Sequence, residues 1–501
     1  MRPDDLLDAI GEIGEDKIQR AHEPVKRRLY RKWMGPVAAV LAIAMLAGVL
    51  LRGGDKTPDS QNALAPYRIA AVTYPEAVQR PDSEAYTGAD GQVDWNALSE
   101  ARQKWYASTG VQYKDMNAYR GRLDGFLAAS IPAFLDGEAG ENRVYSPLNV
   151  YLALAMLSET TGGESQQQLL ALLGAADTAE LRQYAKALWN ANYVDDGVSE
   201  SLLSSSLWLN QDIAFVQSTM DTLAADYYAE SYRGEAGSDG FNAALREWLN
   251  ERTGGLLREQ VANVELTEQT ILAILTAVYF RAPWDQEFPA SRTAPDTFHA
   301  PSGDVTCDFM HGGTEGAYYW GENFSAVEKP LTLSTRGGSM WFLLPDEGVT
   351  PEALLGDEEA MRFLLTNKHE WNGGQPVWEN QANVIVHLNV PKFDVSSETD
   401  LAGGLKALGV TDVFAPDSAD FSPMVQNADA LLPFVSKAVH AARVMIDEEG
   451  VVAAAYTEIG MDTGSSLPPA EEIDFTLDRP FLFAITGADE LPLFVGVVNQ
   501  P

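Results

Sequence analysis

Residues 447–469 read DEEGVVAAAYTEIGMDTGSSLPP, and this stretch decides between two structures for the carboxyl-terminal part of the chain. Its alanines and glutamates favour a surface helix. Gly450 at its head and the β-branched Val451 and Val452 favour an extended strand instead. No proline occurs from Val451 to Leu467, so every backbone N–H there can donate to a neighbouring strand. The residues alone leave both alternatives open.

The composition is that of an acidic, folded chain. It has 501 residues, 46% of them hydrophobic, and a formal net charge of −37. This length suits one large domain or two to three ordinary ones. So large an excess of acids argues against nucleic acid as a partner, because phosphates would be repelled. Cys307 is the single cysteine, which excludes an intramolecular disulfide and a zinc site built from several thiolates.

An uncharged apolar run, MGPVAAVLAIAMLAGVLL, occupies residues 34–51. As a helix it would reach about 27 Å, close to the hydrocarbon thickness of a bilayer. Five basic residues precede it closely: Lys26, Arg27, Arg28, Arg31 and Lys32. By the positive-inside rule, the run predicts a single-pass anchor in the cell membrane, with a cytoplasmic amino terminus and an extracellular remainder. A cleaved signal peptide is the alternative, although 33 residues before the apolar run are long for one.

The rest of the chain divides into segments that differ in polarity and in hydrophobic periodicity. Residues 1–33 predict a polar cytoplasmic tail, and residues 52–120 predict a stalk or extension with a local helix around Trp95 to Thr109. Helix-like periodicity then prevails from Leu123, and strand-like runs prevail after Thr270. Helices first and strands last predict the mixed α+β class.

Motifs for catalysis and metal binding are absent from the sequence. It contains no G-x-x-x-x-G-K-[ST] loop, no G-x-G-x-x-G turn after a strand, no H-E-x-x-H pair and no G-x-S-x-G elbow. Ser436 and His440 share a strand-like run, but four residues of strand separate them by about 13 Å, too far for a hydrogen bond. We therefore expect no catalytic residue, no metal and no cofactor.

Short motifs from residue 142 onward occur in one consistent order. They are NRVYSP (142–147), QLLALLG (168–174), TGG (253–255), AVYFRAPWDQEF (277–288), SMWFLLP (339–345), VPKF (390–393), LKALGVTD (405–412), VSKAVH (435–440), DEEG (447–450), FTLDRPFLF (475–483) and LFVGVV (493–498). In this order they resemble the serpins, a family of serine and cysteine protease inhibitors. The resemblance covers roughly residues 123–501.

The resemblance implies a serpin domain over residues 121–501, with about nine helices packed on three β-sheets and an exposed reactive-centre loop at about residues 450–472. It also implies suicide-substrate inhibition: a target protease cleaves the loop, whose upstream part inserts into the central sheet while the protease is trapped covalently. We expect an inhibitor rather than an enzyme, acting as a monomer. The alternative is a non-inhibitory serpin-fold binding or scaffold protein at the cell surface.

The resemblance and the period-two alternation of strands together give the hinge and the residues that face inward after insertion: Glu449, Gly450, Val451, Ala453 and Ala455. These residues beyond the hinge are small or apolar and suit burial, whereas the bulky Tyr456 faces the other way. Val451 and Tyr456 depart from the small residues usual in inhibitory members. Slow insertion, which would make the chain a mere substrate, is therefore the alternative to inhibition.

The resemblance also locates the bond that a protease would cut. Counting about fifteen residues from Gly450, as in typical inhibitory members, places it between Gly464 and Ser465, with Met461 as the alternative. A small or apolar residue before the bond favours a subtilisin-like or elastase-like target. No basic residue lies between Val451 and Glu472, which argues against trypsin-like proteases.

The family has a buried polar cluster where its main sheet opens. By the resemblance, Ser146 and His440 match two of its members, and Trp284 matches the tryptophan beneath the hinge. Asn149 stands where the family has a serine, and Thr276 where it has an asparagine. Because an unpaired buried polar group costs about 1 to 3 kcal/mol, we expect this exchange to keep the partners paired.

Overall fold

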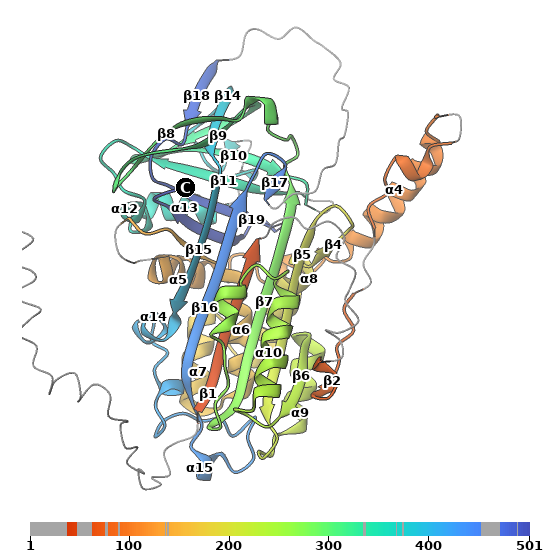
Figure 1. The fold of residues 1–501 in the computed structure, drawn as a ribbon, viewed down its shortest axis with the longest axis vertical. Helices are drawn as coiled ribbons and strands as arrows, with labels where there is room; N and C mark the ends of the chain where they lie inside the picture. Colours follow the sequence, from red (N-terminus) through yellow and green to blue (C-terminus); the bar gives the residue numbers. More distant parts are fainter. Residues whose placement is uncertain are drawn as a thin grey trace, which may run out of the picture. The chain divides into compact units, whose positions relative to one another are not determined.

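Two nine-stranded sheets with helices packed between and around them make up the protein (Figure 1). The computed structural model describes residues 38–47, 63–75, 79–88, 91–135, 137, 140–333, 337–366, 368–372, 375–451, 471–487 and 489–501. All of these residues belong to one compact unit, Val37–Pro501.

The described residues hold twelve α-helices. They are α4 (Trp95–Gly110), α5 (Asp124–Leu135), α6 (Pro147–Thr160), α7 (Gly163–Leu173), α8 (Thr178–Asn192), α9 (Gln217–Asp226), α10 (Asp239–Arg252), α11 (Arg258–Ala262), α12 (Pro351–Leu355), α13 (Glu358–Leu365), α14 (Leu401–Ala407) and α15 (Ala428–Leu431). Four 3-10 helices are η1 (Glu84–Tyr86), η2 (Met116–Ala118), η3 (Ala290–Arg292) and η4 (Asp412–Phe414).

The main sheet contains the long strands that the helices cover. Its order is β1 (Ala38–Ala47), β16 (Phe434–Ile446), β17 (Gly450–Val451), β7 (Thr270–Pro283), β5 (Glu200–Asn210), β6 (Ala229–Gly234) and β2 (Arg68–Ala70), with β15 (Phe393–Asp400) on β16 and β4 (Val194–Asp195) on β5. Strand β1 also pairs with β7, so it lies between β7 and β16 (Figure 1).

The second sheet is one continuous ladder. Its order is β18 (Glu472–Thr476), β14 (Gln381–Pro391), β9 (Gly303–Trp320), β10 (Phe324–Leu331), β11 (Gly338–Pro345), β19 (Phe481–Thr486), β20 (Pro492–Val498) and β3 (Arg143–Tyr145), with β8 (Ala294–Ala300) on β9. A small hairpin joins β12 (Trp371–Asn372) and β13 (Gln375–Pro376).

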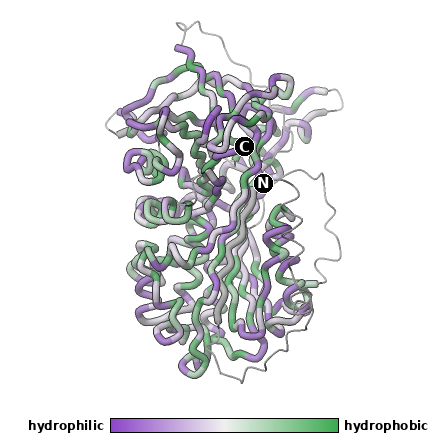
Figure 2. The backbone as a smooth tube through the Cα atoms, turned by 60° about the vertical axis from the view of Figure 1, so that its left-hand side comes forward, coloured by the Kyte–Doolittle hydropathy of each residue, from purple (hydrophilic) through white to green (hydrophobic). Residues whose placement is uncertain are grey.

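Helix α6 lies between the two sheets and contacts β7, β1 and β20. All fourteen of its residues are buried, as its near-continuous apolar sequence requires. On the other face of the main sheet, α10 packs its Phe241, Leu245 and Trp248 against Trp208 and Ala273, among others, in a second core. The central strands are therefore covered on both faces, which explains their mostly apolar sequences (Figure 2).

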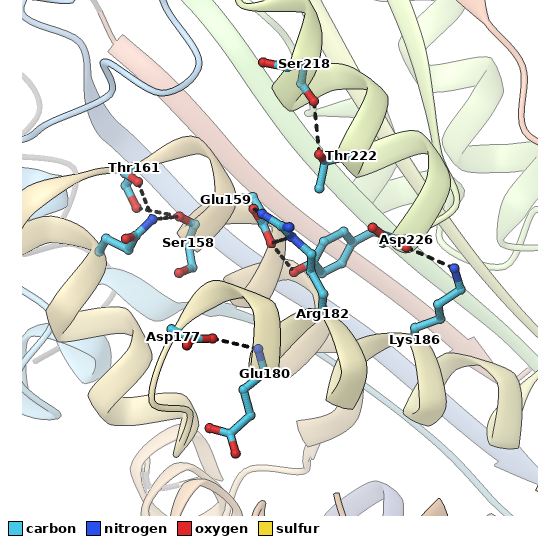
Figure 3. A network of polar contacts seen from close by, with 12 residues as sticks. Ser158, Glu159, Thr161, Asp177, Glu180, Arg182, Lys186, Ser218, Thr222 and Asp226 are labelled. Carbon is cyan, nitrogen blue, oxygen red and sulfur yellow. Dashed lines mark hydrogen bonds and ion pairs between the residues drawn. The ribbon is translucent and has the colours of Figure 1, made fainter. Parts of the chain in front are cut away.

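A partly buried ion pair joins the helices at one end of this arrangement (Figure 3). The Glu159 carboxylate, at the end of α6, accepts hydrogen bonds from the Arg182 guanidinium of α8 at 2.6 and 2.9 Å. It also accepts one from the Tyr227 hydroxyl, which follows α9, at 2.9 Å. Three helices far apart in sequence are thereby fixed to one another.

The segment that precedes the predicted serpin domain, for which a stalk or extension was expected, packs against that domain in its described residues. Leu64 is buried in the second core, and β2 adds to the edge of the main sheet through β6. The ring of Tyr74 stacks on Trp189, Tyr193 and Tyr228, with centroid separations of 5.8, 5.8 and 6.3 Å. The predicted local helix is present as α4.

The predicted membrane helix at residues 34–51 is not what the structure contains there. Ten of these residues form strand β1, whose backbone is hydrogen-bonded to β7 and β16. Among the described residues, no helix combines the length and the apolar character needed to cross a bilayer. An uncharged run suits the interior of a bilayer and the interior of a protein equally. In this structure the backbone N–H and C=O groups of β1 find their hydrogen-bond partners in the two neighbouring strands.

Two further expectations about the architecture need correction. The described residues hold twelve α-helices rather than about nine. The three expected sheets are present there, as the two nine-stranded sheets and the two-stranded β12–β13 sheet. Strands also begin earlier than expected, because β5 and β6 precede α10. The α+β class itself is confirmed.

The Tyr74 stack gives a test of this packing. Tyr74→Ala removes three aromatic contacts, each contributing about 0.5 to 1.5 kcal/mol, so we expect the free energy of unfolding to fall by about 2 to 3 kcal/mol. Chemical denaturation measures it. Trp95→Ala is the control, because Trp95 is 68% exposed and should cost no more than about 0.5 kcal/mol. Equal effects of the two variants would contradict the docking of this segment.

Candidate functional site

The candidate site lies where β7 and β16 part at the top of the main sheet (Figure 1). The short strand β17 fills the gap between them: Val451 pairs antiparallel with Ala282 of β7 and with Ile446 of β16. Val451 is fully buried. The loop was expected at about residues 450–472, and the two residues of this range that β17 contains lie in the sheet.

A tight turn carries the chain from β16 into β17. The Asp447 carboxylate accepts hydrogen bonds from the backbone N–H groups of Glu449 and Gly450, at 3.0 and 3.2 Å. The Asp447 N–H donates to the Gly450 carbonyl at 3.1 Å. An aspartate that bonds to the backbone two residues on is typical of such turns. The side chain of Asp447 thus holds the predicted hinge.

Gly450 is required here by a close approach between backbones. A Cβ atom on this residue would lie 2.5 Å from the Ala282 carbonyl oxygen and 2.7 Å from the Pro283 Cα. The φ angle of Gly450 is not among the positive ones, so its backbone conformation does not itself require glycine. The absence of a side chain is what lets β17 reach β7.

Trp284 lies beneath the hinge, as the resemblance implies. It is buried, its indole Nε1–H donates to the Asp447 carbonyl, and its backbone N–H donates to the Glu449 carbonyl, both at 2.9 Å. Its ring meets Phe288 edge to face at 5.9 Å. Trp284 therefore fixes the turn from below, through the backbone of the hinge.

Glu448 holds the hinge from the side, a role that the sequence analysis missed. Its carboxylate accepts hydrogen bonds from the Lys392 ammonium at 2.8 Å and the Thr293 hydroxyl at 2.7 Å. Partial burial raises the pKa of Glu448, but these hydrogen bonds outweigh it and lower the pKa below its ordinary value. Lys392 could have been suspected from its place in the VPKF motif, whereas Thr293 carries no sequence signal.

The hinge is also a place where carboxylates crowd. Burial, followed by the charges of Asp447, Glu287 and Glu448, raises the pKa of Glu449. Among the residues that the structure describes, Glu448 has a cationic partner in Lys392 and no such ion pair is found for Glu449, so the two adjacent glutamates differ in character. The Glu448 carboxylate is held by Lys392, whereas the charged form of Glu449 is destabilised by the neighbouring carboxylates.

The polar cluster below the hinge is buried at every predicted position: Ser146, Asn149, Thr276 and His440. The His440 Nε2 accepts a hydrogen bond from the Ser146 N–H at 3.2 Å, which places the proton of a neutral ring on Nδ1. Burial lowers the pKa of His440 to about 3. Neither His440 Nδ1 nor Thr276 Oγ1 has a hydrogen-bond partner among the described residues. We expected the exchange of the amide and the hydroxyl to keep every partner paired, and for Thr276 this is not found among the described residues.

The remaining predicted residues of the loop lie outside the described residues. These are Ala453, Ala455, Met461, Gly464 and Ser465. Their roles stay predictions from the sequence.

Comparison with known proteins now decides the family. The family model described as "Serpin (serine protease inhibitor)" matches residues 127–501. The chain belongs to the serpin family. A relative described as putative serpin-Z12, from Oryza sativa subsp. japonica, is 31% identical over 392 residues, which cover 73% of this chain and 86% of the relative. Plasminogen activator inhibitor 1 of Sus scrofa is 28% identical over 72% of this serpin and 87% of its own length.

A solved structure agrees with this assignment at the level of the fold. The native state of the thermophilic serpin tengpin superimposes with a TM-score of 0.65 and 24% identity, covering 76% of this chain and 93% of tengpin. Serpins are in general protease inhibitors and not enzymes, so the comparisons support an inhibitory role in general terms. The segment before residue 127 lies outside the family match.

The buried His440 predicts a pH dependence of stability. The unfolded chain takes up a proton near the ordinary pKa of 6.5, whereas the folded chain resists protonation down to about 3. Stability from this group is therefore present above pH 6.5 and is lost as pH falls below it, by about 1.4 kcal/mol per pH unit. Denaturation of His440→Gln across pH 4–7 should show a shallower loss than wild type. His299→Gln is the control: its hydrogen bond to Asp304 raises the pKa of this exposed histidine, so its removal should not make the acid loss shallower.

Gly450→Ala tests the close approach at the hinge. The added methyl group would strike backbone atoms of β7, so we expect β17 to detach at a cost of about 1 to 3 kcal/mol. Hydrogen exchange should then show faster exchange at residues 447–451. The matched control is Gly403→Ala, where a Cβ atom meets nothing within 4 Å. Unchanged protection of Val451 in Gly450→Ala would contradict this geometry.

Proposed function

We propose that this serpin is a suicide-substrate inhibitor of serine or cysteine proteases. Cleavage of its reactive-centre loop releases a segment that inserts antiparallel between β7 and β16 and traps the attached protease covalently. The observation that carries this proposal is the pairing of Val451 with both Ala282 and Ile446. The first residue after the hinge already has the position and direction that an inserting strand would continue.

The sequence of the loop supports the same proposal. A strand between two others must donate and accept hydrogen bonds on both sides, and no proline interrupts residues 451–467. Val451 is already buried in the sheet, which supports entry of the strand despite the departure of this residue from the small residues usual in inhibitory members. His440 and Trp284 are both buried, and because burial lowers the pKa of His440 to about 3, its ring adds no charge below the hinge.

The target class rests on the sequence. Gly464 and Ser465 flank the proposed scissile bond, with Met461 as the alternative, and the segment from Val451 to Glu472 carries no basic residue. We propose a subtilisin-like or elastase-like protease as the target. The extracellular location also stays a prediction from the apolar run at residues 34–51 and its basic flank. Protease protection of the intact cell tests that location directly.

A non-inhibitory serpin-fold binding protein is the second candidate, and the bulky Tyr456 in the loop favours it. The two functions predict different products with a protease. An inhibitor forms a covalent complex that survives SDS, whereas a binding protein is merely clipped. Incubation with subtilisin or elastase, followed by mass spectrometry of the released carboxyl-terminal peptide, distinguishes them and gives the scissile bond.

Val451→Arg should convert the inhibitor into a substrate. An arginine at this buried position would have to carry an unpaired charge into the sheet, at a cost of several kcal/mol. The measurement is the fraction of chains that form SDS-resistant complex rather than clipped product. Val452→Arg is the matched control, because alternation sends the next residue to the opposite face. Trapping by Val451→Arg at the wild-type level would refute the inward position of this residue in the inserting strand.

A further inference from the structure

Strand β1 occupies the space between the two central strands of the main sheet (Figure 1). All ten of its residues pair in parallel with β7, from Thr270 to Phe280, and seven of them, Ala38–Ala44, pair in parallel with β16, from Phe434 to Ala441. Among the described residues, β7 and β16 pair only with strands that lie between or outside them, never with each other. The segment Ala38–Ala47 is therefore the strand that joins the two halves of the sheet below the hinge.

The same space is the one that the reactive-centre loop would need. Val451 pairs antiparallel with Ala282, so each further loop residue would face the preceding residue of β7. Residues 453–463 would thus face Phe280 back to Thr270, which is the stretch that β1 pairs. The loop and β1 cannot both be there. Residue 463 lies one position before Gly464, the residue that precedes the proposed scissile bond.

The chemistry of the segment suits the space. The sequence AAVLAIAMLA has no charge and no proline, as a strand between two others and under two layers of helices requires. Helix α6 contacts β1 from one side. On the other side, a cavity of about 50 Å³ is lined by residues of α10 and α11 together with Leu275 of β7 and Val439 of β16. These two helices therefore cover the gap on that side.

We propose that the gap between β7 and β16 is a binding site for the chain's own segment 38–47, which acts as an internal competitor of the reactive-centre loop. The effect on protease trapping rests on the proposed function, whereas the position of segment 38–47 between β7 and β16 does not. A parallel pair is slightly less stable per residue than an antiparallel one, so the cleaved loop is the better occupant and displaces β1. Displacement adds a step to trapping, and it slows trapping relative to cleavage.

The segment cannot lie in a bilayer while it is in the sheet. Residues 38–47 make up the centre of the apolar run at 34–51, and a membrane-spanning helix needs that run whole. Withdrawal of the segment into any apolar environment would therefore vacate the gap and speed trapping. Occupancy of the gap, rather than the protease site itself, sets the activity of the inhibitor.

Disulfide trapping tests the position of the segment in the full-length chain. In a Cys307→Ser background, Ala42→Cys is combined with Leu275→Cys or with Val439→Cys, its register partners on β7 and β16. Adjacent strands bring Cα atoms within the range that a disulfide spans. Mild oxidation and peptide mass spectrometry should find the disulfide in at least one pair. Leu50→Cys with Leu275→Cys is the control from the same apolar run, and it should stay reduced. A disulfide in neither Ala42 pair overturns the proposal.

Proline substitution tests the competition. Ile43→Pro removes a backbone N–H from the middle of β1, so the segment should leave the gap and SDS-resistant complex with subtilisin should form at least about tenfold faster. Leu50→Pro, outside β1, should trap at the wild-type rate. Equal rates for both variants overturn the competition, even if the disulfide forms.

The two experiments separate this inference from the proposed function. If the disulfide forms but neither wild type nor Ile43→Pro traps subtilisin, inhibition fails and the position of the segment stands. If the disulfide is absent while wild type traps efficiently, the inhibitor stands and the internal competitor is refuted. In the oxidised Ala42–Leu275 pair, trapping should be lost and then restored by reduction.

Discussion

The main sheet depends on one constraint: its two central strands need a third strand between them. The backbone groups of β7 and β16 that point into the gap are buried under helices on both faces, where unpaired N–H and C=O groups are costly. In this structure two separate segments supply the partners, β17 at the top and β1 below it. The gap can thus be filled by more than one segment of the chain. An inhibitor that inserts its own loop requires a gap of this kind.

The hinge controls entry to this site through a few polar contacts. Asp447 closes the turn, Trp284 fixes it from below, and the Glu448 carboxylate with Lys392 holds it from the side. Gly450 brings the chain against β7, and Val451 is already buried beyond it. These contacts set the register from which the rest of the loop would follow. They also explain why a buried charge at the start of the strand would be so damaging.

Much of the fold could be predicted from the sequence, because its signals are local. Strand β11 has the bounds expected from GSMWFLLP, and helix α6 follows from its apolar run. The hinge was located by family motifs, which also placed Ser146, Thr276 and His440 in one buried region. The position of β1 could not be predicted, since an uncharged apolar run satisfies both a membrane helix and a strand buried on both faces. Tyr74 and Thr293 also escaped prediction, because their partners lie far along the chain.

The central claim is that the gap accepts the chain's own cleaved loop as a better occupant than the one it has. Thermal unfolding of the intact chain and of the chain cleaved within residues 452–470, compared at one pH and protein concentration, tests it most directly. The account predicts a higher melting temperature for the cleaved chain, because an antiparallel strand covalently continuous with β17 then fills the gap. Equal melting temperatures would show that no loop had entered the sheet and would contradict the account.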